Sequence, residues 1–296
     1  MTQRFLEYIA VEKRYSPHTV ISYRKDLEDF TAFLLETESH SDLLKADKKI
    51  VRNFISQLSQ NQISKRSINR KISTLRSFYK FMLKLSEVEV SPVDNIASLK
   101  FYAEKQISFS EEEMDDLLNL FQGQFAEKIL EKTIIETLYQ TGMRRAELCS
   151  IRLKDVDFEK KEILLHGKGN KARVVPFSDS LAAEYQKFIT QNHAVYSAEK
   201  PFLVRPNGKN VTEKFVYSVV NSYLSMVTSK KKKSPHILRH SFATTVLKNG
   251  AKISKVKKIL GHSSLASTQV YTNANIEQLK KVFNLAHPRA TKKDER

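Results

Sequence analysis

The stretch SPHILRHSFAT, residues 234–244, decides how the second half of this 296-residue chain is interpreted. The serine and proline that open it favour a helix N-terminus, because proline needs no backbone N–H at the first helical position. His236, Arg239 and His240 are spaced so that all three side chains share one face of this helix. A helix N-terminus attracts anions and disfavours imidazolium. The stretch therefore predicts a phosphate site beside a neutral His236.

The same stretch also fits two interpretations other than a phosphate site. Histidines four residues apart bind zinc in HExxH motifs, but Ile237 stands where that motif has glutamate. Cys149 is the only cysteine and offers no cluster, so we predict no metal site. A packed histidine beside a surface arginine is the other interpretation. The stretch alone leaves it open.

Composition limits the class of protein and its partners. Hydrophobic residues make up 41% of the chain, and its length allows two domains with their own cores. The formal net charge of +17 points to a polyanionic partner, most often nucleic acid. An anionic membrane surface is the competing partner, but we find no continuous basic amphipathic helix with an aromatic face.

The sequence also bounds the compartment in which we expect the protein. A single cysteine excludes an internal disulfide. The first residues lack a signal-peptide core, and no apolar run approaches the length of a membrane span. These features predict a cytoplasmic protein that does not engage a membrane.

Residues 1–86 predict an all-helical domain. Its fourth helix opens at Ser64, and an apolar stripe runs along it at helical spacing, formed by Ile68, Ile72, Leu75, Tyr79 and Met82. Polar side chains lying largely off this stripe are candidate contacts to DNA phosphates: Lys65, Arg66, Asn69, Arg70, Lys71 and Arg76. An ordinary solvated face is the alternative for such residues.

Residues 87–107, with Pro92, predict an interdomain linker, and residues 108–296 predict a second domain that is mainly helical. Two strand-like runs, 162–166 and 172–177, flank GKGN and predict a small β-hairpin with Lys168 at its tip. Lys171 and Arg173 are further candidate DNA contacts on this hairpin. Gly261 is a typical helix-ending residue and would place His262 just past a short helix.

Four separated segments together resemble the tyrosine recombinases, the phage integrase family. They are TGMRRAEL (141–148), GKGNKARVVP (167–176), HILRHSFAT (236–244) and LGH (260–262), followed nine residues later by Tyr271. The length and two-part layout are similar to the bacterial Xer recombinases. The segments YSPHTVISYRKDLEDF and SINRKISTLRSFYKF resemble that family's N-terminal domain, so the resemblance spans nearly the whole chain. A chance pairing of histidine and arginine at 236–240 does not explain the other three segments.

The resemblance implies a role for each matching residue. Tyr271 would be the nucleophile, Arg144 and Arg239 would hold the scissile phosphate, and Lys168 would protonate the leaving 5′-oxygen. His236 would assist as a base, and His262 would bond a non-bridging oxygen. His240 belongs to the motif with a structural role. The implied fold is a helical SAM-like core-binding domain followed by the tyrosine recombinase catalytic domain.

The chemistry suits these residue types. Guanidinium groups can bond the phosphate oxygens in a forked geometry and stay charged, whereas a phenol with a pKa of about 10 needs a base and an activated phosphate. No ATP is implied, because the covalent link conserves the energy of the broken bond, and the resemblance implies no cofactor or metal. The sequence has neither a carboxylate cluster for magnesium nor a phosphate-binding Walker loop.

The resemblance implies a site-specific recombinase that joins duplex DNA through a 3′-phosphotyrosyl link and a Holliday junction. Four protomers, identical or with a paralogous partner, would act on two DNA sites. We favour Xer-type resolution of chromosome or plasmid dimers. A mobile-element integrase or invertase, a type IB topoisomerase and a non-catalytic DNA-binding protein remain the alternatives. The segment from Asn275 onward would dock on a neighbouring protomer in this family, although its apolar stripe fits self-packing equally.

Overall fold

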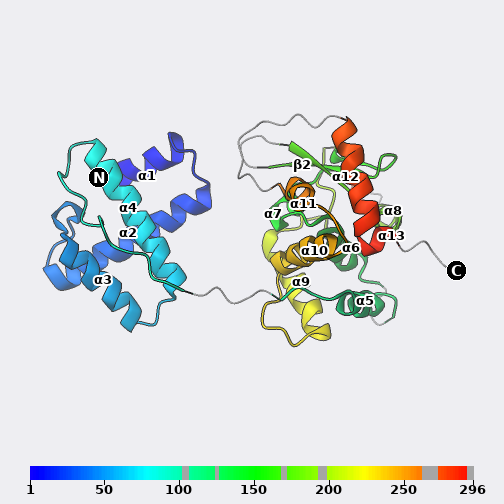
Figure 1. Ribbon diagram of the computed structural model, residues 1–296, viewed down its shortest axis with the longest axis horizontal. Coiled ribbons are helices and arrows are strands. Elements are labelled where there is room, and N and C mark those ends of the chain that lie inside the picture. Colours follow the sequence, from blue (N-terminus) through cyan, green and yellow to red (C-terminus); the bar gives the residue numbers. More distant parts are fainter. Residues whose placement is uncertain (102–106, 124–126, 168–171, 193–198, 262–272, 292–296) are drawn as a thin grey trace. The chain divides into compact units, whose positions relative to one another are not determined.

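Two separate apolar cores divide the chain into two units, Met1–Glu104 and Lys105–Arg296, in the computed structural model (Figure 1). The structure describes all residues except 102–106, 124–126, 168–171, 193–198, 262–272 and 292–296. Both units are mainly helical, and the second holds a small sheet, which confirms the fold class predicted from the sequence.

Side chains cap the N-termini of three helices in the first unit. Ser16, Asp47 and Ser64 each accept a hydrogen bond from a backbone N–H three residues further on, at 3.2, 2.7 and 3.2 Å. Such caps satisfy donors that have no partner within the helix. The helices of this unit are α1 (Thr2–Val11), α2 (Pro17–Glu38), α3 (Lys48–Gln60) and α4 (Lys65–Lys84), with a 3-10 turn at Leu43–Lys45.

The core of the first unit uses the predicted stripe of α4. All five stripe residues are buried, and the Tyr79 hydroxyl donates a 2.6 Å hydrogen bond to the Leu43 carbonyl. The sequence assigned residues 87–107 to a linker, whereas Val93 and Ile96 of that range are buried in this core. The Asn69 side chain also bonds the backbone of Leu99 twice, at 2.9 and 2.8 Å. Apolar residues and this amide therefore hold part of the segment against α4.

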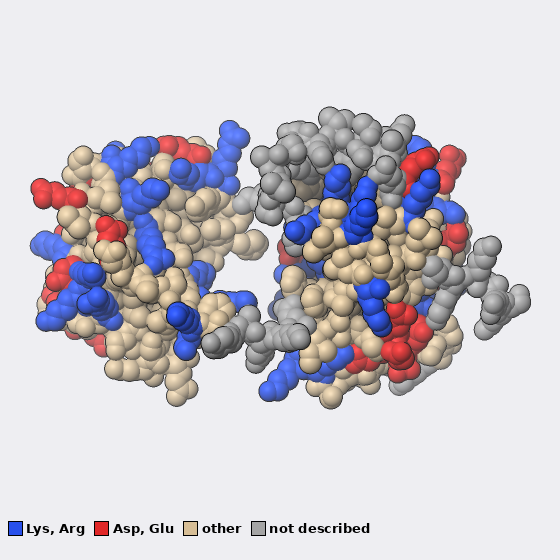
Figure 2. All heavy atoms as spheres, in the orientation of Figure 1, with Lys and Arg blue, Asp and Glu red and all other residues tan. Residues whose placement is uncertain are grey.

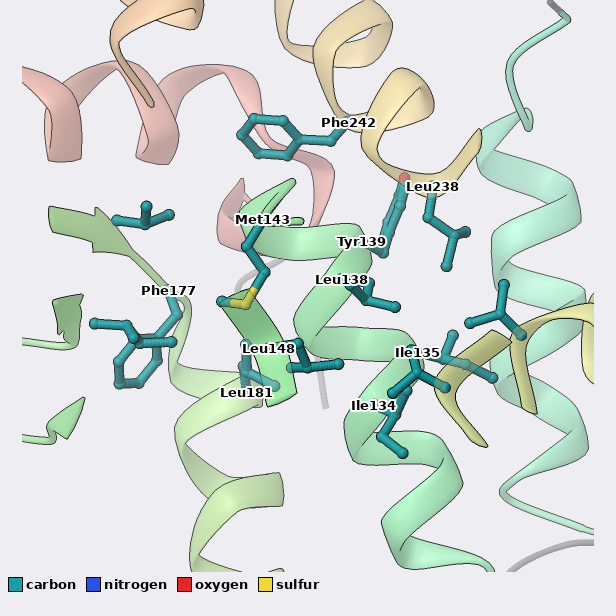
Figure 3. Close-up of a cluster of buried hydrophobic side chains, with 14 of the residues drawn as sticks. Ile134, Ile135, Leu138, Tyr139, Met143, Leu148, Phe177, Leu181, Leu238 and Phe242 are labelled. Carbon is teal, nitrogen blue, oxygen red and sulfur yellow. The ribbon is translucent and has the colours of Figure 1, made fainter. Parts of the chain in front are cut away.

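The second unit surrounds the buried helix α6 (Figure 3). Ile134, Ile135 and Leu138 of α6 face apolar side chains that include Leu181 of α8 and Leu238 of α10. The helices of this unit are α5 (Glu111–Leu120), α6 (Ile129–Thr141), α7 (Arg145–Ser150), α8 (Asp179–Gln191), α9 (Glu213–Val227), α10 (Pro235–Lys248), α11 (Ile253–Leu260), α12 (Asn273–Ala286) and α13 (Pro288–Thr291), with a 3-10 turn at Leu153–Asp155.

A three-stranded antiparallel sheet lies in the same unit, in the order β1-β2-β3. Its strands are β1 (Val156–Asp157), β2 (Glu162–His166) and β3 (Ala172–Pro176). Glu162 pairs with Pro176 and His166 with Ala172, which confirms the predicted hairpin between these two runs. Lys168 and Lys171 lie between β2 and β3, outside the described residues.

Gly142 ends α6 and sets the path of the chain into the site. Its φ of +60° is a left-handed conformation that favours glycine. A Cβ here would lie 2.5 Å from Cδ1 of Phe242 and 2.8 Å from Cδ2 of Leu260, so α10 and α11 approach the turn closely. The turn places Arg144, two residues later, next to α10 and α11.

The C-terminal helices pack on their own unit. Leu279 and Phe283 of α12 are buried in the core of the second unit. Lys280 pairs with Glu162 of β2 at 2.7 Å, and Arg289 of α13 pairs with Asp115 of α5 at 2.8 Å. Leu279 and Phe283 of the predicted apolar stripe thus contact their own unit.

No helix within the described ranges is both long and apolar enough to cross a membrane.

Candidate active site

Three of the six predicted catalytic residues lie in the part of the chain that the structure describes. Arg144, His236 and Arg239 can be placed, and they come from separate elements of the second unit. Lys168, His262 and Tyr271 lie outside the described residues. The described part of the site therefore consists of the two arginines, His236 and the groups that hold them.

Arg144 stands at the N-terminus of α7, held by Glu147. Its backbone N–H donates to Oε2 of Glu147 at 2.6 Å, and its Nη1 donates to Oε1 at 2.9 Å. Nη2 also donates to the carbonyl oxygen of Gly261 at 3.3 Å. The side chain is nevertheless 47% exposed. Arg144 is thus oriented by the protein while part of its guanidinium faces solvent.

Arg239 is the buried arginine of the pair, at 6% exposure. It projects from α10 and donates through Nη1 to the Gly142 carbonyl and through Nη2 to the Leu260 carbonyl, both at 2.6 Å. Burial, together with the nearby charges of Arg144 and Arg173, lowers the pKa of Arg239 to about 10. The guanidinium still carries its charge at neutral pH, because that pKa lies well above 7.

Glu147 and Arg173 form a buried ion pair behind the site. Nη1 of Arg173 donates to Oε1 of Glu147 at 2.6 Å, and Nη2 donates to Oε2 at 2.7 Å. Burial alone would raise the pKa of Glu147, but the hydrogen bonds from Arg173 and from the Arg144 backbone outweigh it and lower the pKa to about 2. Glu147 is therefore an anion at neutral pH, surrounded by donors.

The sequence predicted Arg173 as a DNA contact, and the structure gives this side chain a different setting. Arg173 is 6% exposed and is bonded to Glu147 and to the Ile259 carbonyl, the latter at 2.8 Å. Its charge does not reach the surface because it pairs with Glu147. Glu147 itself was missed as a site residue. Its place three residues after Arg144 was the available signal, since residues at that spacing share a helix face.

Three successive carbonyls at the end of α11 accept hydrogen bonds from the three arginines. The carbonyls of Ile259, Leu260 and Gly261 accept from Arg173, Arg239 and Arg144 in that order. The last carbonyls of a helix have no partner inside it, and they form the negative end of its dipole. Gly261, with a φ of +66°, ends this helix as predicted, immediately before His262. The end of α11 thus brings together arginine side chains from β3, from α10 and from the N-terminus of α7.

His236 occupies the second position of α10, one turn before Arg239. Its side chain is exposed, yet partial burial followed by the charges of Arg239, His240 and Arg144 lowers its pKa. The neutral form that the sequence predicted is therefore favoured. Ser234 precedes the helix as predicted, but its side chain makes no capping hydrogen bond.

A basic cavity of about 370 Å³ lies beside the N-terminus of α10. The amide nitrogen of Asn221 on α9 donates to the Lys233 carbonyl at 2.8 Å and fixes one wall. The cavity is lined by Tyr217, Asn221, Lys231, Lys232, Lys233, Ser234 and Ile237. Positive charge therefore continues from the arginines along the surface next to His236.

No group of three or more histidine, cysteine, aspartate or glutamate side chains is placed to hold a metal ion within the described ranges.

The basic residues predicted on α4 divide into exposed and buried ones. Lys65, Arg66 and Arg70 are exposed. Lys71 is not: its side chain is 7% exposed and its Nζ is paired with Asp26, at 3.0 Å, and with Asp29. The predicted contact of Lys71 with DNA therefore lacks an accessible charge, because two carboxylates of α2 hold the ammonium group in the interior.

Two further candidates on α4 are used inside the first unit. Asn69 bonds the Leu99 backbone, and Arg76 donates to the Ile96 carbonyl. Arg70 pairs with Asp26 at 2.5 Å but keeps 43% of its side chain exposed. Lys and Arg side chains also lie across the visible face of each unit (Figure 2). Among the DNA contacts predicted on α4, the exposed charges are thus those of Lys65, Arg66 and Arg70.

The chain is similar to known proteins over nearly its whole length. Residues 108–278 match the phage integrase family, and residues 2–84 match the phage integrase N-terminal SAM-like domain. The chain is 36% identical over 299 residues to the tyrosine recombinase XerC of Pediococcus pentosaceus, covering 97% of each chain. It is 35% identical over 294 residues to XerC of Staphylococcus aureus, covering 99% of this chain and 98% of the relative.

Solved structures share the fold. One is the XerH site-specific recombinase bound to its palindromic difH substrate in a post-cleavage complex, with a TM-score of 0.71 at 18% identity, covering 95% of this chain and 83% of that chain. Another is the Tn1549 transposon integrase in complex with circular intermediate DNA, with a TM-score of 0.69 at 19% identity, covering 95% and 98%.

Proposed function

Because this chain belongs to the phage integrase family of tyrosine recombinases, we propose that it cleaves and rejoins duplex DNA through a covalent link to Tyr271. It is a site-specific recombinase by this membership. The single observation that carries the proposed chemistry is the meeting of Arg144 and Arg239 at the end of α11, with His236 one turn from Arg239. Such a cluster of fixed positive charge suits a phosphodiester.

The arginines are proposed to stabilise the negative charge that grows on the non-bridging oxygens as the nucleophile attacks. Fixed donors in a site that excludes water act strongly, because they need not reorganise during the reaction. Arg239 is held by two backbone carbonyls, and Arg144 is held by Glu147 with part of its guanidinium exposed. Arg144 would therefore meet the phosphate from the solvent side and Arg239 from the protein side.

The remaining roles follow from the motifs. The Tyr271 oxygen attacks phosphorus and forms a 3′-phosphotyrosyl bond, while Lys168 protonates the 5′-oxygen that leaves. His236, whose pKa is lowered, would accept the tyrosine proton. His262 would bond a non-bridging oxygen. The freed 5′-hydroxyl of another strand then attacks the phosphotyrosyl bond, which restores a phosphodiester and releases Tyr271.

Both units would contact the DNA duplex. We place a core-binding domain in residues 1–86 and the catalytic domain in residues 108–296. In the first domain, Lys65, Arg66 and Arg70 are exposed, which supports phosphate contacts by these three residues. Contacts of this kind fix the position of the protein on DNA without reading its sequence.

The cellular role is proposed as Xer-type resolution of chromosome or plasmid dimers. Identity of 35–36% to XerC proteins over nearly the full chain supports this role over a mobile-element integrase. Four protomers would act on two DNA sites and exchange strands through a Holliday junction, either alone or with a paralogous partner. The protein would work in the cytoplasm, where the chromosome lies.

Covalent trapping in cells tests the function directly. Denaturing lysis of cells that express the wild-type protein should recover DNA fragments joined to it, and sequencing those fragments should return one short site. The Tyr271→Phe variant should recover none. Fragments spread evenly over the chromosome would contradict a site-specific recombinase, and a site confined to a mobile element would contradict the dimer-resolution role.

A further inference from the structure

We infer that Arg173 is a positioning residue, which keeps the catalytic Arg144 available to the DNA phosphate by occupying the Glu147 carboxylate. The Nε, Nη1 and Nη2 atoms of Arg173 all donate within the protein, to the Ile259 carbonyl and to Glu147, so we assign its charge to Glu147 and not to the substrate. The inference rests on the proposed function, because it explains how one of the two phosphate-binding arginines is kept in place.

The two arginines share Glu147 unequally. Arg173 bonds both carboxylate oxygens, at 2.6 and 2.7 Å, in the fork that a guanidinium forms best. The Arg144 side chain bonds only Oε1, at 2.9 Å. Because Arg173 forms the two-pronged contact, the Arg144 side chain bonds the carboxylate through Nη1 alone and keeps 47% of its surface exposed.

Loss of Arg173 would leave Glu147 buried with too few donors. A buried carboxylate is stable only when paired and fully hydrogen-bonded. The nearest remaining guanidinium is that of Arg144, which already contacts Oε1. Carboxylate and phosphate suit the same guanidinium fork, so the two anions would compete for Arg144. Glu147 would then hold the Arg144 guanidinium against its own carboxylate, and Arg144 would not be available to the phosphate.

Arg173 also contacts the end of α11. Its Nε donates to the Ile259 carbonyl at 2.8 Å. A Cβ on Gly261 would lie 3.1 Å from Cδ of Arg173, so the side chain packs against the turn that ends the helix. Arg239 and Arg144 bond the next two carbonyls of that same helix end. One side chain on β3 therefore braces both the Glu147 carboxylate and the acceptor site of the two phosphate-binding arginines.

A lysine could replace only part of this arrangement. It supplies a positive charge for Glu147 but lacks the planar fork, and it cannot bond both carboxylate oxygens and the Ile259 carbonyl as the guanidinium does. The conservative variant Arg173→Lys should thus behave between the wild type and Arg173→Met.

The test uses the full-length protein and a nicked suicide duplex built on the site recovered by covalent trapping. One version carries the normal scissile phosphate, and the other carries a methylphosphonate, in which a methyl group replaces a charged non-bridging oxygen. Arg173→Met should slow cleavage of the normal duplex about 100-fold, the size of effect seen when one transition-state donor is lost. Arg173→Met should slow cleavage of the methylphosphonate duplex less than about 10-fold, because the transition state on that duplex has less negative charge for Arg144 to stabilise.

A double variant separates positioning from folding. If Glu147 captures Arg144, then removing its charge in Arg173→Met/Glu147→Gln should restore part of the lost cleavage rate. A purely structural Arg173 would make the double variant slower than the single one. Arg152→Met is the matched control, because Arg152 lies in the same unit but pairs with the exposed Glu199 at 2.9 Å. It should cleave both duplexes like the wild type.

Equal losses on the two duplexes, or a double variant slower than Arg173→Met, would overturn the inference. If Arg173→Met does not fold, as judged by circular dichroism, Arg173→Lys carries the same two comparisons with smaller expected losses. A wild-type protein that cleaves neither duplex would instead refute the proposed function, so the two failures are distinguishable.

Discussion

Arg239 donates a 2.6 Å hydrogen bond to the carbonyl of Leu260, the last residue of α11, and thereby ties α10 to the end of the neighbouring helix. A second bond of the same length reaches Gly142, which ends α6. Arg239, one of the two proposed phosphate-binding residues, is therefore also a junction between three helices. Arg144 has no comparable place in the core, since its side chain is 47% exposed.

This difference predicts that the two arginines contribute differently to stability. Arg239→Gln should lower the free energy of unfolding by about 2 kcal/mol, because two buried carbonyls lose charged donors. Arg144→Gln should lower it by about 0.5 kcal/mol or less, as for a half-exposed ion pair. Both variants should lose cleavage by about 100-fold or more. Urea titration followed by circular dichroism measures the first effect, and equal stability losses would contradict the assigned geometry.

Lys168→Ala should slow strand cleavage, because the leaving 5′-oxygen then lacks its proton donor. A substrate with sulfur at the 5′-bridging position should restore much of the rate, since a thiolate leaves without protonation. Lys160→Ala is the matched control, an exposed lysine whose partner is Asp157 at 3.2 Å. Absence of sulfur rescue would remove Lys168 from the role of acid.

The lowered pKa of His236 predicts the acid limb of the cleavage rate. Partial burial and the charges of Arg239, His240 and Arg144 favour the neutral imidazole, so it should remain able to accept a proton below pH 6.5. The midpoint of the acid limb should therefore lie below pH 6.5 and vanish in His236→Gln. Cleavage rates measured from pH 5 to 9 test this, and a His236-dependent midpoint above 6.5 would contradict it.

His287 predicts how stability depends on pH. Burial, together with the charge of Arg289, lowers its pKa to about 3, while the unfolded chain titrates near 6.5. Between these two pKa values the unfolded state binds a proton that the folded state does not bind. The contribution of His287 to the free energy of unfolding should therefore fall by about 1.4 kcal/mol for each pH unit below 6.5. The stabilisation is fully present above pH 6.5.

Urea unfolding at pH 7.5, 6 and 5 measures this slope. His287→Phe keeps an aromatic ring against Phe283, which stacks on His287 at a centroid distance of 5.0 Å. The variant should show a flatter pH dependence than the wild type. An unchanged slope would show that His287 does not cause the loss.

Local features of the fold were predictable from the sequence because they depend on neighbouring residues. The apolar stripe of α4 is buried, as its helical spacing predicted. The helix that carries His236 and Arg239 begins at Pro235, also as predicted. Each of these follows from hydrogen bonds and periodicity within a few residues.

Ion pairs between residues that are distant in the sequence were not predictable in the same way. The sequence predicted that Lys71 and Arg173 contact DNA at the surface. Each is instead buried, because it pairs with a carboxylate that is distant in the sequence. Asp26 lies 45 residues from Lys71, and Glu147 lies 26 residues from Arg173. Whether a charged side chain faces DNA or the interior is decided by such partners, which spacing along one helix or strand does not reveal.

The chemical identity of the residue that links to DNA tests the central claim most directly. The wild-type protein is incubated with the nicked suicide duplex, the adduct is digested with nuclease and protease, and the modified peptide is sequenced by mass spectrometry. We predict a nucleotide remnant on Tyr271, joined through a 3′-phosphate, and no adduct in Tyr271→Phe, which should still bind the duplex. A remnant on any other side chain, or adducts that persist in Tyr271→Phe, would contradict the account.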